Sequence, residues 1–342
     1  MSSATSAPRP AQARLRLASR DGRLVPSPRR GRLLAAHTER WLHGVWTAAT
    51  DSRPPPGVAL AAVGGLARRD AGPTSDLDLV LLHDGESLDD GALAALAERL
   101  WYPVWDAGFP LDHSVRTPAQ CREIAETDVA ATVGLLDLRL VAGDGRVVET
   151  TKARLLSRWR FGVRGWLGQL ETDLYERGRR SGDAAHLLEP DLRESRGGLR
   201  DVLVLRALTA TWLADRPHAP VDRAYARLLD ARDALQVVSG RRGARLVQAD
   251  QQAVAALLGL GSADEALRSV SDAARTISHA LDATLRRARQ AVTPPARRRT
   301  RGPSVRLLGY GVAEADGEVV LGRGARPDAD PVLPLRVAAA AA

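Results

Sequence analysis

The chain has 342 residues, of which 44% are hydrophobic and 26% charged, with a net charge of +8 and a single cysteine. This length can form more than one buried core, so two domains are expected. One cysteine excludes an intrachain disulfide framework and is typical of a reducing compartment, so we predict a cytoplasmic location. No apolar segment approaches the length of a membrane span, so no membrane partner is predicted.

The positive charge is concentrated at the two ends of the sequence. Residues 1–32 contain eight arginines and one acidic residue, and four more arginines lie within residues 297–301. The sequence between these two clusters is slightly acidic. Proteins that bind nucleic acid usually have a basic track on their folded surface, so we predict no nucleic-acid partner.

The first predicted elements precede a hydrophobic strand. Residues 1–30 are rich in Ser, Ala, Pro and Arg and have no hydrophobic periodicity, which predicts a disordered basic tail. Leucine and tryptophan then recur at helical spacing, which predicts a helix over residues 31–50. Three prolines at positions 54–56 end this helix and lead into a strand that begins at Gly57.

Residues 57–83 contain the most informative pattern. A hydrophobic strand ends at Gly64 and Gly65, and after ten intervening residues a second hydrophobic strand opens with Asp76 and Asp78. Side chains alternate along a strand, so both aspartates lie on one face. Adjacent carboxylates repel each other unless a cation lies between them, and oxygen ligands suit Mg²⁺ or Mn²⁺ held jointly with phosphates. The pattern predicts a divalent metal site.

The residues beside this pair favour a phosphate ligand. Gly64 and Gly65 allow a sharp turn that brings backbone amides close to a phosphate. Arg68 adds a positive charge nearby. The alternative is structural: an isolated Asp-x-Asp often marks a solvated strand end, and a glycine pair often marks only a turn.

Two more elements complete the first predicted domain, which spans residues 31–145. A helix is predicted over residues 87–100 and a third strand over residues 109–116. Alternation along that strand places Asp112 on the same face as Arg116.

The rest of the sequence is mainly helical. We expect an all-helical domain over residues 146–292, and a linker with the start of a C-terminal region over residues 293–342. The charged block at residues 187–201 contains a glycine pair and interrupts the helices. Such a loop either reaches a bound triphosphate or acceptor, or forms only a salt-bridge network.

Several of these segments together resemble known proteins. The glycine pair followed by Ser75-Asp76-Leu77-Asp78-Leu79 is similar to the nucleotidyltransferase signature of the DNA polymerase β superfamily. Over roughly residues 31–340, the chain more closely resembles the transferase half of the bacterial PII uridylyltransferase/uridylyl-removing enzymes. The further matching blocks are Tyr102-Pro103-Val104-Trp105-Asp106-Ala107-Gly108, His113-Ser114-Val115-Arg116-Thr117, Leu187-Leu188-Glu189-Pro190-Asp191-Leu192 and Gly197-Gly198-Leu199-Arg200-Asp201.

The resemblance implies an α+β fold, in which a polymerase β-like domain with a mixed sheet flanked by helices precedes an all-helical domain. It implies that Asp76 and Asp78 hold one or two divalent ions. The residues then expected to bind the phosphates are Gly64, Gly65, Arg68, Ser75 and Arg200. Arg193 stands where the family usually has lysine, a change that keeps the charge and alters the geometry.

Polymerase β-like sites commonly use a third carboxylate on a later strand. Asp112 is one candidate because of its position in the third predicted strand. Asp137 is the rival, since it matches an acidic position of the family. Asp137 also suits an ion pair with Arg139 or a helix cap.

The implied reaction transfers UMP, or AMP, from UTP or ATP to a tyrosine of the nitrogen-regulatory PII protein and releases pyrophosphate. The alternatives are nucleotidyl transfer to a small molecule such as an aminoglycoside, and a non-catalytic remnant that binds PII or nucleotide. The sequence contains no spaced histidines of the kind found in the family's hydrolase domain. Uridylyl-removing activity is therefore not expected.

Overall fold

The computed structural model describes residues 9–293, 305–315 and 318–341. The chain divides into two units, Met1–Val292 and Thr293–Ala342. Residues 1–8 of the predicted tail and residues 294–304 of the predicted linker lie outside the described part.

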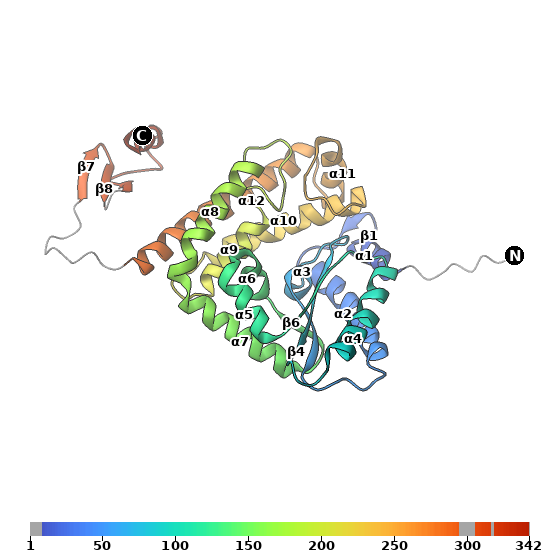
Figure 1. The fold of residues 1–342 in the computed structure, drawn as a ribbon. Helices are drawn as coiled ribbons and strands as arrows, with labels where there is room; N and C mark the ends of the chain where they lie inside the picture. Colours follow the sequence, from blue (N-terminus) through green and yellow to red (C-terminus); the bar gives the residue numbers. More distant parts are fainter. Residues whose placement is uncertain (1–8, 294–304, 316–317, 342) are drawn as a thin grey trace. The chain divides into compact units, whose positions relative to one another are not determined.

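A four-stranded mixed sheet forms the centre of the sheet lobe, the name we give to residues 29–143 (Figure 1). The strand order is β5-β4-β3-β6. Strands β4 and β5 are parallel, whereas β3 is antiparallel to both β4 and β6. This mixed sheet, followed by a largely helical region, confirms the predicted α+β class. The strands are β3 (Val58–Ala62), β4 (Leu77–His83), β5 (Leu111–Arg116) and β6 (Arg139–Gly143).

Helices cover both faces of this sheet. They are α2 (Arg29–Ala49), α4 (Asp90–Asp106), α5 (Pro118–Thr127), α6 (Val129–Leu135) and α7 (Gly145–Phe161). Leu77 and Leu81 of β4 pack in one core with α2 and α4, while Val80 and Leu82 pack in the opposite core with α5, α6 and α7. Asp78 shares the face of Val80 and Leu82, as the alternation predicts.

The helical region, residues 145–292, begins with α7 and has its own core. Its other helices are α8 (Val163–Ser181), α9 (Leu199–Thr209), α10 (His218–Ser239), α11 (Gln248–Leu258) and α12 (Ala263–Val292). Leu205, Leu228 and Ile277 are fully buried where α9, α10 and α12 meet. The region is largely helical, as the predicted fold class requires.

Helices α7 and α8 meet at Gly162, where two tryptophan rings stack. The ring centroids of Trp159 and Trp166 are 3.7 Å apart, with an angle of 12° between the ring planes. Trp159 Nε1 donates a hydrogen bond to Ala207 O at 2.8 Å, and Trp166 Nε1 donates to Trp159 O at 3.1 Å. Both indole donors therefore have acceptors, and the hydrogen bond from Trp159 links the junction of the two helices to α9.

The N-terminal segment, residues 9–28, differs from the predicted disordered tail. It forms α1 (Pro10–Ala18) and a short hairpin of β1 (Ser19–Arg20) and β2 (Arg23–Leu24). Arg14 is only 1% exposed, and Leu24 packs in the core of the helical region. The prediction of disorder was wrong for these residues because it relied on hydrophobic periodicity. The segment is held instead by arginine hydrogen bonds to distant parts of the chain.

In the second unit, the described residues form an antiparallel sheet of order β7-β8-β9 and a terminal helix. The elements are β7 (Val305–Gly309), β8 (Val312–Ala315), β9 (Glu318–Leu321) and α13 (Leu333–Ala341). Among the described residues, no helix combines the length and the hydrophobicity that a membrane span requires.

Candidate active site

A cavity of about 880 Å³ lies between the sheet lobe and the helical region. Its walls come from β4, β5 and α6 on one side and from α8, α9 and α10 on the other. The cavity brings together the residues predicted from the sequence, namely Gly64, Gly65, Arg68, Ser75, Asp76, Asp78, Asp112 and Arg200. Asp137, the rival third carboxylate, is not among the lining residues.

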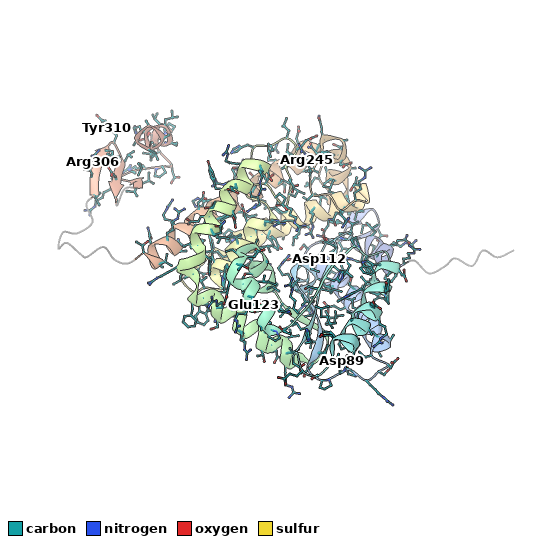
Figure 2. The ribbon with its side chains drawn as sticks, in the orientation of Figure 1. Asp89, Asp112, Glu123, Arg245, Arg306 and Tyr310 are labelled. Atoms are coloured by element: carbon teal, nitrogen blue, oxygen red, sulfur yellow. The ribbon has the colours of Figure 1, made fainter. Side chains whose placement is uncertain are left out.

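Three aspartates share one wall of the cavity. Asp76 directly precedes β4, and Asp78 is the second residue of that strand. The parallel register of β4 and β5 places Asp112 opposite Asp78. Figure 2 labels Asp112 among the side chains of the structure. Neighbouring strands are about 4.8 Å apart, so the carboxylate of Asp112 lies beside the pair identified from the sequence. Of the two candidates for a third carboxylate, the geometry favours Asp112.

The acidic wall is electrostatically unfavourable in the absence of a cation. Burial raises the pKa of Asp78 to about 6, and the charges of Asp76 and Asp112 act in the same direction. Arg193 and Arg68 act in the opposite direction but do not cancel the effect. A cation beside these carboxylates would relieve the repulsion, so the donor set fits a hard divalent ion.

The aspartates do not enclose such an ion by themselves. Among the residues that the structure describes, no group of three or more His, Cys, Asp and Glu side chains is arranged to hold a metal ion. Mg²⁺ is usually bound through one or two carboxylates together with water and substrate phosphates. An open site of this kind fits Asp76 and Asp78.

The raised pKa of Asp78 predicts a stability gain when its charge is removed. The folded protein holds this proton up to about pH 6, whereas the unfolded chain releases it near pH 3.9. Ionised Asp78 therefore lowers stability above pH 6, and the penalty fades as the pH falls from 6 to 4. We expect D78N to raise the free energy of unfolding by about 1–3 kcal/mol at pH 8, with a smaller gain at pH 5. Urea unfolding in EDTA at both pH values measures this. An equal gain at the two values would contradict it.

The glycine turn, α3 (Gly64–Arg68), is shaped around Asp78. Gly64 has φ +59°, and a Cβ at this position would lie 2.3 Å from Asp78 Oδ2. Val63 N donates a hydrogen bond to Asp78 O at 3.0 Å. Any side chain at position 64 would therefore displace the carboxylate as well as strain the backbone. Gly65 follows Gly64 and also lines the cavity.

Arg68 is more deeply engaged than the sequence predicts. Its Nε lies 3.0 Å from Asp70 Oδ2, and its Nη1 lies 2.6 Å from Asp137 Oδ2. Burial lowers the pKa of Arg68, but the charges of Asp70 and Asp137 raise it well above its ordinary value. Asp137 therefore pairs with Arg68 rather than with Arg139, whose side chain contacts Glu39.

A buried cluster, which we call the Asp70 cluster, joins this turn to α10. Asp70 Oδ2 accepts a hydrogen bond from Tyr225 Oη at 2.6 Å, and Arg232 Nη2 donates to Asp70 O at 2.6 Å. Arg68 and Arg206 complete the cluster, with Arg206 Nη1 at 3.7 Å from Asp70 Oδ2. Sequence reasoning missed Tyr225 and Arg232 because both lie within an unbroken helical pattern that gives no sign of a distant carboxylate.

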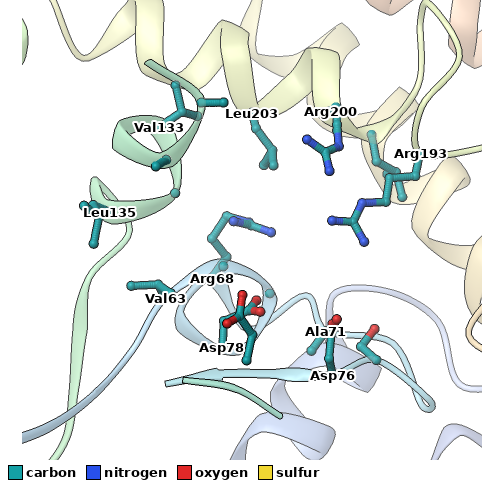
Figure 3. Close-up of a pocket in the computed structure, with 18 of the residues that line it drawn as sticks. Val63, Arg68, Ala71, Asp76, Asp78, Val133, Leu135, Arg193, Arg200 and Leu203 are labelled. Carbon is teal, nitrogen blue, oxygen red and sulfur yellow. The ribbon is translucent and has the colours of Figure 1, made fainter. Parts of the chain in front are cut away.

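The opposite wall of the cavity is basic. Figure 3 shows the guanidinium groups of Arg193 and Arg200 extending from the helical side towards Asp76 and Asp78. Arg200 Nε donates to Glu194 Oε1 at 2.8 Å, whereas Arg193 Nε is 3.5 Å from the same oxygen. The block at residues 187–201 therefore has features of both predicted alternatives. It forms salt bridges, and it also reaches the cavity. The sequence patterns did not identify the other arginines on this wall, which are Arg177, Arg180, Arg232 and Arg242.

Comparisons with known proteins identify relatives of this chain. A family model described as GlnD PII-uridylyltransferase matches residues 169–285. The bifunctional uridylyltransferase/uridylyl-removing enzyme of Streptomyces coelicolor is 49% identical over 97% of this chain and 40% of its own length. The proteins of the same description from Mycobacterium tuberculosis (strain H37Rv) and Corynebacterium glutamicum are 44% and 41% identical, each over 84% of this chain.

A structural match is much weaker. One chain of a crystal structure of a toxin–antitoxin with AMP-PNP aligns with 38% of this chain and 96% of its own, at 13% identity and a TM-score of 0.25. The fold described above rests on the strands and helices of the chain itself.

The sequence matches extend over the sheet lobe and the helical region alike, since they cover 84% to 97% of the chain. The chain spans 36% to 40% of the length of these curated relatives. On this evidence, the chain is homologous to a part of the bifunctional uridylyltransferase/uridylyl-removing enzymes, and its residues 169–285 match the GlnD PII-uridylyltransferase model.

Proposed function

We propose that this chain is a metal-dependent nucleotidyltransferase that transfers UMP, or AMP, from UTP or ATP to a tyrosine of a PII protein. The observation that carries the proposal is the meeting of Asp76, Asp78 and Asp112 in a cavity whose opposite wall presents Arg193 and Arg200. The homology to bifunctional uridylyltransferase/uridylyl-removing enzymes supports the PII acceptor.

The residues of the cavity suit each part of this reaction. Asp76 and Asp78 would hold Mg²⁺ or Mn²⁺, which when bound offsets the negative charge of the reacting phosphates. The amides of the glycine turn, Ser75 and Arg200 would bind the triphosphate. Asp112 is exposed on the same wall. It would accept the proton of the acceptor hydroxyl.

The chemistry balances without a further reactant. The tyrosine oxygen forms a bond to the α-phosphorus and loses its proton, the bond from the α-phosphorus to the bridging oxygen breaks, and pyrophosphate leaves. Catalysis of this kind depends mainly on positioning and electrostatic stabilisation.

A direct assay tests the proposal. The protein is incubated with PII, Mg²⁺ and UTP or ATP labelled at the α-phosphate, and label on PII is measured after removal of free nucleotide. We expect metal-dependent labelling with one of the two nucleotides, lost when the acceptor tyrosine is replaced by phenylalanine. Labelling of an aminoglycoside in place of PII would refute the proposed acceptor. No labelling with either nucleotide would refute the proposed activity.

Replacing Arg193 tests the basic wall. We expect R193Q to raise the KM for the nucleotide about tenfold, because a hydrogen bond to a charged group contributes about 1.5–3 kcal/mol and about 1.4 kcal/mol corresponds to a factor of ten. Arg193 is the informative choice because its contact with Glu194 is the longer of the two. Initial rates at varied nucleotide concentration give the KM. The control is R164Q, which changes an exposed arginine of α8 outside the cavity lining. Equal KM values for the two variants would contradict the prediction.

A further inference from the structure

The residues between the glycine turn and the two aspartates are held by distant parts of the chain. Arg14 of α1 donates from Nη1 to Ser75 O at 3.0 Å and from Nη2 to Gly72 O. On the opposite side, Gln236 Oε1 of α10 accepts a hydrogen bond from Thr74 N at 3.2 Å. The loop at residues 72–75 is therefore clamped between the N-terminal segment and α10.

The contact with Ser75 bears directly on Asp76. Ser75 O and Asp76 N belong to one peptide unit, and this unit is planar. A hydrogen bond that fixes the direction of the Ser75 carbonyl therefore also fixes the orientation of the backbone at Asp76. Arg14 donates to both ends of the loop with a planar guanidinium, which holds two acceptors in a defined geometry.

Arg14 is an unusual residue to find at this position. Its side chain is 1% exposed, and within the part of the chain that the structure describes its Nε has no hydrogen-bond partner. Burial lowers the pKa of Arg14 to about 10, while the charges of Asp233 and Asp76 act to raise it. A buried charge is weak evidence for stability, since a hydrophobic side chain often serves equally well. The two directed contacts to the loop give Arg14 a more specific role.

We propose that Arg14 is a positioning residue of the active site, which fixes the loop at residues 72–75 and, through the Ser75 carbonyl, the orientation of Asp76. The inference rests on the proposed function in so far as Asp76 holds the metal. It makes the N-terminal segment part of the catalytic apparatus, although that segment precedes the sheet lobe and contributes no group to the reaction.

The experiment compares R14Q and R14K with R16Q, which changes an exposed arginine on the same helix. Mn²⁺ binding is measured by electron paramagnetic resonance in the presence of a non-hydrolysable UTP analogue, and kcat and KM are measured in the transferase assay. Groups that orient a metal ligand typically change metal affinity by about 10- to 100-fold. We expect a loss of this size in R14Q, a smaller loss in R14K, and wild-type values in R16Q.

A purely structural role would lower thermal stability but leave the Mn²⁺ affinity of the folded fraction unchanged. We expect kcat to fall in R14Q, since Asp76 is misoriented, with a smaller change in the KM for the acceptor. If R14Q does not fold, R14K decides, because lysine keeps the charge but cannot hold both carbonyls in the same geometry. A folded R14K or R14Q with the Mn²⁺ affinity of R16Q would overturn the inference.

The experiment distinguishes a failure of Mn²⁺ binding from a failure of nucleotidyl transfer. If wild-type protein binds Mn²⁺ but labels no acceptor, the proposed function is wrong, and the binding comparison still decides the role of Arg14. If wild-type protein does not bind Mn²⁺ with or without the analogue, both proposals are overturned.

Discussion

Replacing Asp78 by asparagine should lower the kcat of nucleotidyl transfer by about 10³-fold or more. A metal ligand that stabilises developing charge contributes several kcal/mol to the transition state, and each 1.4 kcal/mol corresponds to about a factor of ten. Asparagine keeps the size of the side chain and removes the negative charge, while Gly64 leaves room for the new amide. Single-turnover transfer of α-labelled nucleotide to PII measures the effect independently of product release.

The matched control is D90N, because Asp90 is an exposed aspartate in the first turn of α4, on the side of the sheet away from Asp78. We expect D90N to keep wild-type kcat. Together with the stability gain predicted above, D78N should be a more stable and nearly inactive protein, a combination that is typical of a residue kept for function. A D78N variant with more than a tenth of wild-type activity would exclude Asp78 as a metal ligand.

The second large effect concerns the Asp70 cluster. We expect D70A to lower the free energy of unfolding by about 3–5 kcal/mol, because removal of one partner leaves the other buried charges uncompensated. Asp70 is 8% exposed and holds both Arg68 and Tyr225. Urea unfolding followed by circular dichroism measures the change.

The control for D70A is D282A, which removes an ion pair at the surface. Arg196 and Asp282 are in contact at 2.5 Å, but both side chains are about half exposed. Exposed pairs of this kind contribute about 0–1 kcal/mol, so D282A should change stability little. Equal losses of unfolding free energy in D70A and D282A would show that the Asp70 cluster contributes no more to stability than an exposed ion pair.

The parts of the site that follow from local spacing could be predicted from the sequence. Gly64, Gly65, Asp76 and Asp78 are defined by neighbours within a strand–turn–strand segment, and Asp112 by the alternation of its own strand. Their position next to one another depends on the strand register. Asp78 pairs with Asp112 in the parallel β4–β5 ladder, although the two residues are more than thirty positions apart in the sequence. Periodicity gives the face of each strand but not the partner strand.

Long-range polar contacts could not be predicted in this way. Arg14 reaches Ser75 over 61 residues, and Tyr225 reaches Asp70 over 155 residues. An arginine-rich segment without hydrophobic periodicity has the same sequence pattern whether it is solvated or buried against carbonyl groups.

The start of the short helix α5, in contrast, follows from a local sequence pattern. Thr117 and Gln120 form a capping box, and both residues have the spacing that this motif requires.

The stacked tryptophans at the junction of α7 and α8 have a consequence for how the walls of the cavity are held together. Helix α7 packs on the sheet, and α8 contributes to the far wall of the cavity. The stacked rings at this junction therefore connect the sheet to the part of the cavity wall that α8 contributes, which includes Arg177 and Arg180. Side chains of the cavity wall that are already ordered in the folded protein lose little further conformational entropy when a ligand binds. A smaller entropy loss on binding favours a higher affinity for the ligand. The stacked rings of Trp159 and Trp166 are thus a packed connection between the helix on the sheet and the helix at the cavity.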